Sequence, residues 1–143
     1  MLQEFAQWIE NVTAWTIGVN LFVGHLPDYL PGTNQTKLPE RLVLILETTP
    51  AGVDAELPDR VDKEIQFWNR AQTYFTARAD AHAIYKRLHG RSWIELPVLT
   101  VGEEYVIWTA DAVAEPYPIE NPGPTGLFVF STNLILRVAD KNA

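Results

Sequence analysis

The sequence contains no cysteine. This absence excludes a disulfide scaffold, a thiolate metal site and a cysteine nucleophile. The chain also lacks any apolar run near the roughly 18 residues that a membrane helix needs. Its first residues have no basic segment, and Glu4 and Glu10 interrupt the apolar residues there, so they do not match a signal peptide. We therefore expect a protein that is soluble and intracellular when it is made.

Basic residues are few. The 143-residue chain has 11 Lys and Arg against 18 Asp and Glu, and its net charge is -7. DNA affinity comes largely from Lys and Arg that neutralise phosphates, and the basic residues here are dispersed rather than clustered. We expect no specific nucleic-acid binding. The acidic excess has two interpretations: it keeps the protein soluble, or it forms a negative surface past which DNA would slide.

Arrangements typical of catalysis or metal binding are missing as well. His82 and His89 are seven residues apart, whereas metal-binding histidine pairs on helices are usually three or four apart. His25 lies near Asp28 without a nucleophile that would complete a triad. We therefore expect a protein that is not an enzyme and that holds no metal and no cofactor.

The residues that are present predict two helices and a sheet. Residues Leu2–Val12 and Tyr74–Gly90 carry apolar stripes at helical spacing, the second with Thr73 as its N-cap and Gly90 just past its end. Apolar or alternating stretches predict a short strand over 19–23 and longer strands over 41–47, 63–70, 93–99, 105–110 and 127–138. We expect a single domain, 1–143, of the α+β class. Its single mixed or mainly antiparallel sheet would have about five strands, with two helices packed on one face.

Alternation within two of these strands predicts which side chains face the core. Ile65 and Phe67 should lie on the covered face, and Trp68 on the opposite face, either under a loop or in an interface. In the closing strand, the residues expected in the core are Phe128, Phe130, Leu134, Leu136 and Val138, and those expected on the other face are Ser131, Asn133 and Arg137.

Three stretches, in a fixed order along the chain, carry a family resemblance. Near the start is NLFVGHLPDYLP; in the middle, an Arg-Ala pair ends a strand and leads into YFTARADAHAIYKRLHG; near the end, a proline- and glycine-rich loop leads into GLFVFSTNLILRV. Together they resemble the minor capsid or tail-terminator proteins of tailed bacteriophages. The matches span most of the chain, and their order and spacing are more specific than any one motif.

A tail terminator is a virion structural protein of the phage neck. The resemblance implies a ring, usually hexameric, that caps the tail tube and joins it to the head connector. The partners would be further copies of the chain, the tail tube protein and the head connector or other neck proteins. DNA would only pass through the lumen, no membrane would be involved, and assembly would take place in the bacterial host cytoplasm.

Acidic clusters and two tryptophans are the candidates for an interface or for the lumen of such a ring. Four carboxylates crowd one loop, namely Asp54, Glu56, Asp59 and Asp62. Asp111 and Glu115 lie at a strand end, and the tryptophans are Trp8 and Trp68. We expect at least one of the two acidic clusters to face the channel.

Other functions remain open at this point. A head-completion or connector protein of the same neck would have similar features. The five tryptophans and five tyrosines also fit a different class, a small carbohydrate-binding module. A hydrolase with an assembled carboxylate site is the third alternative.

Overall fold

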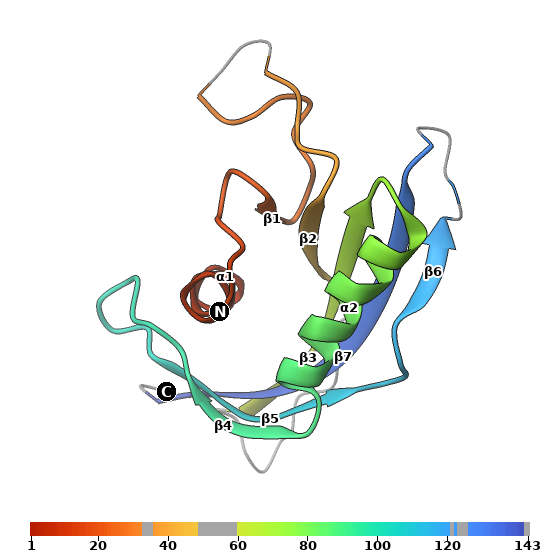
Figure 1. Cartoon of the computed structure of the whole chain (residues 1–143). Helices are drawn as coiled ribbons and strands as arrows, with labels where there is room; N and C mark the ends of the chain where they lie inside the picture. Colours follow the sequence, from red (N-terminus) through yellow and green to blue (C-terminus); the bar gives the residue numbers. More distant parts are fainter. Residues whose placement is uncertain (33–35, 49–59, 121, 123–125, 142–143) are drawn as a thin grey trace.

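The computed structural model describes residues 1–32, 36–48, 60–120, 122 and 126–141. In these residues the chain forms two helices and a seven-stranded, mostly antiparallel sheet (Figure 1). The elements are α1 (Leu2–Val12), β1 (Leu21–Val23), β2 (Leu42–Glu47), β3 (Arg60–Ala71), α2 (Tyr74–Leu88), β4 (Arg91–Glu95), β5 (Tyr105–Ala112), β6 (Tyr117–Glu120) and β7 (Phe128–Asp140). The strand order is β1-β2-β3-β7-β5-β4, and β6 pairs with β7 beyond the end of β5.

The two longest strands, β3 and β7, form the centre of the sheet. They pair antiparallel from Arg60 opposite Ala139 to Ala71 opposite Phe128. Because side chains alternate along a strand, this one register decides which residues of both strands share a face. The predicted α+β class, with a mainly antiparallel sheet, is confirmed.

The predicted faces of β3 and β7 are also confirmed. Ile65 and Phe67 are fully buried, and the register places Leu134 opposite Ile65. The buried residues of β7 on this face include Phe130, Leu134, Leu136 and Val138. Arg137 lies on the other face and is exposed.

Both helices lie against the same face of the sheet. The sheet curves around α1, and α2 runs along β3 and β7 (Figure 1). Phe5 and Ile9 of α1 join Ile84 and Leu88 of α2 in one buried cluster with the sheet. Fully burying a side chain of this size contributes about 1.5–3 kcal/mol, so this covered face is the main source of stability.

Helix α2 begins and ends where the sequence predicts. The side-chain oxygen of Thr73 accepts a hydrogen bond from the Thr76 backbone N–H at 3.3 Å, which satisfies one free donor of the first turn. Gly90, just beyond the C-cap, has a φ of 76°. This left-handed conformation suits glycine because it has no Cβ.

Small residues let α2 approach the sheet closely. Ala77 and Ala81 are fully buried, and they pack against Ala71 of β3 and Phe130 of β7. The predicted apolar stripe of the helix, which includes these two alanines, is therefore confirmed as its sheet-facing side. A larger or charged side chain at either alanine would separate the two layers.

The prediction of about five strands is wrong, because the described residues form a sheet of seven. Strand β6 lies in a stretch that its prolines and glycines mark as a loop. Pro118 has no N–H for a hydrogen-bond ladder, and it is tolerated because β6 pairs with β7 alone among the described strands. β3 also begins three residues earlier than predicted, at Arg60, and β4 ends at Glu95 rather than at residue 99.

The edge strands β4 and β6 are irregular. Trp93 in β4 has a φ of 55°, which is rare for a bulky side chain. The ladder skips it, pairing Ser92 with Thr109 and Ile94 with Ile107. Together with Pro118 in β6, this leaves both strands without a regular row of free hydrogen-bonding groups.

Candidate functional site

The sheet face opposite the helices is exposed over its middle strands. We call this surface the open face; it consists of Asp62 and Glu64 of β3, Ile135 and Arg137 of β7, and Thr109 and Asp111 of β5. Ile135 is 38% exposed although β7 is a central strand. In the described residues both helices lie on the other side, so this face is available for contact with another molecule.

One row of the open face joins Asp62, Arg137 and Thr109 across three strands. The Asp62 carboxylate oxygen lies 4.0 Å from Nε of Arg137. At this distance, and with both side chains partly exposed, the ion pair contributes little to stability. Its main effect is that the positive charge of Arg137 offsets the negative charge of Asp62 on this surface.

The neighbouring row joins Glu64, Ile135 and Asp111. Neither carboxylate of this row forms an ion pair within the described residues. An exposed apolar side chain thus lies between two uncompensated negative charges. This combination is suited to a protein partner that brings apolar surface and positive charge.

A chain of side-chain hydrogen bonds crosses the sheet beside these rows. Nε2 of Gln66 donates to Oγ of Ser131 at 2.8 Å, and that hydroxyl donates to Oδ1 of Asn133 at 3.2 Å. Nδ2 of Asn133 in turn donates to the Tyr117 hydroxyl at 2.9 Å. The chain links β3, β7 and β6, so it holds the open face in one arrangement.

Trp68 lies on the same side of the sheet but under a loop. It packs in a cluster of apolar residues that comprises Phe22, Leu26, Leu30, Leu38, Leu42, Leu44 and Leu46. The guanidinium of Arg70 donates to the carbonyl of Pro39 at 3.0 Å and so anchors the end of this loop. Of the two positions that the sequence allowed for Trp68, the structure has the one under a loop.

Trp8 packs inside the molecule. Its side chain is buried and stacks on Phe5, with ring centroids 6.4 Å apart. The guanidinium of Arg91 lies 5.2 Å from the Trp8 ring centroid. Within one copy of the chain, Trp8 therefore contributes to the core.

The acidic candidates have different positions. Three of them lie outside the described residues: Asp54, Glu56 and Asp59. Asp62 is part of strand β3 and not of a loop, and Glu115 is exposed in the bend between β5 and β6. The structure brings Asp62 and Asp111, which the sequence placed in separate clusters, onto one face.

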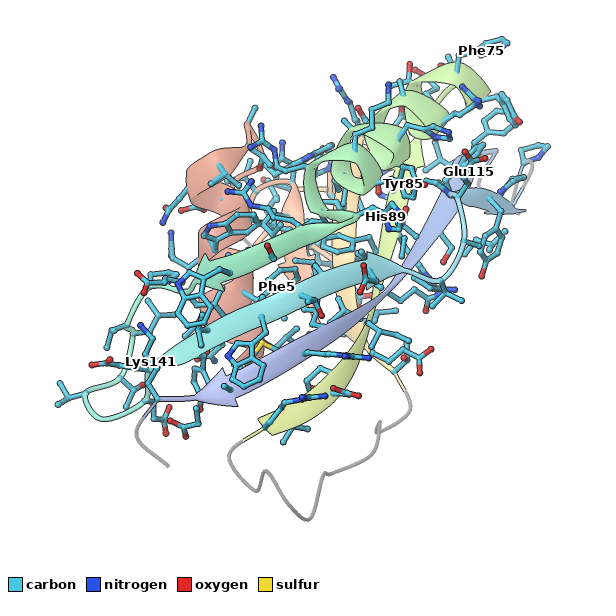
Figure 2. All side chains as sticks on the ribbon, turned by 90° about the horizontal axis from the view of Figure 1, so that it is seen from below. Phe5, Phe75, Tyr85, His89, Glu115 and Lys141 are labelled. Carbon is cyan, nitrogen blue, oxygen red and sulfur yellow. The ribbon has the colours of Figure 1, made fainter. Side chains whose placement is uncertain are left out.

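The outward side of α2 is a feature that the sequence analysis did not single out. We call it the outer face of α2; it comprises the exposed residues Phe75, Arg78, Ala79 and Lys86, with Arg87 at its edge. Phe75 is 78% exposed, and it points away from the tip of the helix (Figure 2). The helical period that predicts the buried stripe also predicts this set, as the residues opposite to it.

A cavity of about 380 Å³ lies between α2 and the segment that follows α1. Arg41 binds the Asp80 carboxylate through two hydrogen bonds, of 2.8 and 2.7 Å. This bonding raises the pKa of Arg41 above its ordinary value, and the guanidinium also lies over the ring of Trp15. Arg87 lines the same cavity. Arg41 and Asp80 are 39 residues apart, so no local pattern could have predicted the pair.

The histidine at the end of α2 has a structural contact. Nδ1 of His89 accepts a hydrogen bond from the backbone N–H of Ala112 at 2.9 Å. Its ring stacks on Tyr85, with ring centroids 5.1 Å apart, and Figure 2 shows the two side by side. Across the ranges that the structure describes, no three His, Cys, Asp or Glu side chains are grouped so that they could hold a metal ion.

Comparison with known proteins gives no match to this chain among protein-family models, curated proteins or solved structures. Among the described residues, no helix is both long and apolar enough to cross a membrane. Functional inference therefore depends on the sequence motifs and on the geometry of the surfaces described above.

Proposed function

We propose that the protein is a structural component of a tailed-phage neck, a tail terminator whose copies close into a hexameric ring. The ring would cap the tail tube and join it to the head connector. The observation that carries this proposal is the open face, where a central strand exposes Ile135 between the carboxylates of Glu64 and Asp111. A surface of this kind suits binding to another protein.

The positions of the three resembling stretches in the fold support the proposal. They fall on β1 and the loop after it, on the end of β3 with α2, and on β7. β3 and β7 are paired strands, and α2 packs on both. The last two stretches thus belong to one packed unit, as expected when a resemblance reflects a shared fold.

The aromatic residues give little support to the carbohydrate-binding alternative. A sugar platform needs exposed aromatic rings, whereas Trp8 and Trp68 pack within the chain. The guanidinium of Arg60 lies over the ring of Trp108, 5.6 Å from its centroid. Trp93, at 61% exposed, is isolated on the edge strand β4. Titration with glycans should give no binding signal.

Electron microscopy and light scattering of the purified chain test the proposed ring. We expect rings of uniform size, with a mass that is a whole multiple of the chain mass. When the protein is added to tail tubes of its own phage, the rings should bind at tube ends and stop their growth. A chain that stays monomeric at high concentration and does not bind tube ends would contradict the proposal. Rings that bind heads instead of tubes would identify a head-completion protein.

A further inference from the structure

The outer face of α2 is positively charged, although the whole chain has a net charge of -7. Arg78, Lys86 and Arg87 are exposed, and none forms an ion pair within the described residues. The one carboxylate of the helix, Asp80, is buried and bound to Arg41. An exposed Phe75 adds apolar surface at one end of this face.

The open face has the complementary composition. It carries three carboxylates and one cation, Arg137, which lies beside Asp62. Glu64 and Asp111 are left uncompensated on either side of the exposed Ile135. Each of the two surfaces therefore combines an exposed apolar side chain with an excess of charge, and the two charges have opposite signs.

These two surfaces cannot meet within one molecule. Helix α2 covers one side of β3 and β7, and the open face is the other side of the same strands. Two copies can bring them together, with α2 of one copy against the sheet of the next. Such a contact is head-to-tail, and repeating it produces either a closed ring or an open filament.

We propose that the outer face of α2 docks on the open face of a second copy of this chain. The contact rests on the proposed ring and names the surfaces that build it. Opposite charges would steer the two copies together and fix their orientation. The apolar side chains Phe75 and Ile135 would lose their contact with water.

The dimensions of the two surfaces agree. The 15 residues of α2 span about 22 Å at 1.5 Å per residue. The open face extended by the flanking Arg60 and Gln66 of β3 spans roughly 20 Å along the strand. This extension includes a second cation, Arg60, so that three carboxylates face two cations. β3, β7 and β5 together are about 10 Å wide, close to the diameter of a helix. The footprint of roughly 250 Å² is below the ~800 Å² per partner of a standard interface. A single contact is therefore weak, and a closed ring, in which each copy makes two, stabilises it.

The absence of native cysteine allows a direct test by disulfide trapping. Ala79→Cys places a thiol on the outer face of α2, and Ile135→Cys places one on the open face. The two single variants are mixed at high concentration and oxidised gently. Mass spectrometry should find a disulfide between positions 79 and 135 in covalent dimers. A chain carrying both substitutions should give a ladder of multimers, because the sheet separates the two positions within one copy.

Charge reversal tests the same contact without cross-linking. Arg78→Glu with Lys86→Glu, or Glu64→Lys with Asp111→Lys, should each weaken self-association at least tenfold. A chain with all four substitutions should associate again, because both charges are then reversed. Glu103→Lys, on an exposed turn away from both surfaces, is the matched control and should have no effect. Thermal melting of each variant verifies that it folds.

The outcomes separate this contact from the proposed function. Rings that form without a disulfide between positions 79 and 135 would overturn the contact and leave the ring standing. Two charge-reversed variants that both fail to associate, and are not restored when combined, would show that the surfaces bind something other than each other. A trapped disulfide in a chain that forms no rings would support the contact and overturn the tail-terminator proposal.

Discussion

The two faces of the sheet are built from the same strands, but they differ in the polarity and burial of their side chains. On the covered face, β3 and β7 present Ile65, Phe67 and Leu134, all fully buried beneath the helices. On the open face, the alternate positions hold Glu64 and the exposed Ile135 and Arg137. Over the middle strands, apolar burial is required on one side only; on the other side, the apolar cluster around Trp68 lies at β2 and the end of β3, under a loop. The stability of the chain is therefore concentrated on the covered face, and the residues of the open face are free to be polar or charged.

A charge placed on the covered face should lower the free energy of unfolding more than any other substitution discussed below. Ala81 is fully buried against the sheet, so Ala81→Glu would bury an unpaired charge and cost several kcal/mol of unfolding free energy. Ala79→Glu, on the exposed side of the same helix, should change the unfolding free energy by about 0.5 kcal/mol or less. Thermal melting compares the two. Equal melting temperatures would show that the helix face is assigned wrongly.

A pair of truncations in β7 compares the two faces along one strand. Phe130 is 2% exposed, and Phe130→Ala should destabilise by about 3–5 kcal/mol because it leaves a cavity between α2 and the sheet. Ile135→Ala, on the open face, should cost about 1 kcal/mol in dilute protein. Urea unfolding measures both values. A larger loss at Ile135 than at Phe130 would contradict the contrast between the faces.

The smallest changes in stability are expected when either of two neighbouring hydroxyl groups, which lie on opposite faces of β7, is removed. Thr132 is buried on the covered face, and its Oγ1 has no hydrogen-bond partner within the described residues. Thr132→Val should therefore be neutral or stabilise by about 1 kcal/mol. Ser131 is hydrogen-bonded to Gln66 and Asn133, so Ser131→Ala should destabilise by about 1 kcal/mol. Chemical denaturation should show a loss of stability for Ser131→Ala alone, and an equal loss for Thr132→Val would contradict this assignment of the hydroxyls.

The covered face was predictable because burial leaves a periodic signal. Apolar spacing gave α2, its alanine stripe and the sheet-facing residues of β7, and the N-cap at Thr73 followed from its position before the stripe. These are local patterns enforced by one requirement, the exclusion of water. The number of strands was not predictable in this way. β6 contains Pro118, and proline usually indicates a loop rather than a strand.

The open face was not predictable as a unit. Asp62 was predicted to lie in a loop because it follows a polar, proline-containing stretch. It lies in β3 instead, since the uncovered face of a strand accepts polar residues just as a loop does. Asp111 is 49 positions further along the chain, and only the shared neighbour β7 brings it to the same surface as Asp62. Arg41 and Asp80, which are 39 positions apart, are likewise brought together only by the fold. Such groupings depend on the order of strands in the sheet, which cannot be predicted from local patterns in a single sequence.

The irregular strands β4 and β6 have a consequence for solubility. A straight, unpaired strand edge is a template on which further chains add strand by strand, and this leads to amyloid-like aggregation. Pro118 has no N–H to offer in β6, and the left-handed Trp93 interrupts the ladder of β4 without shifting its register. Crowded copies of this chain are thereby protected against uncontrolled fibre growth along these strands.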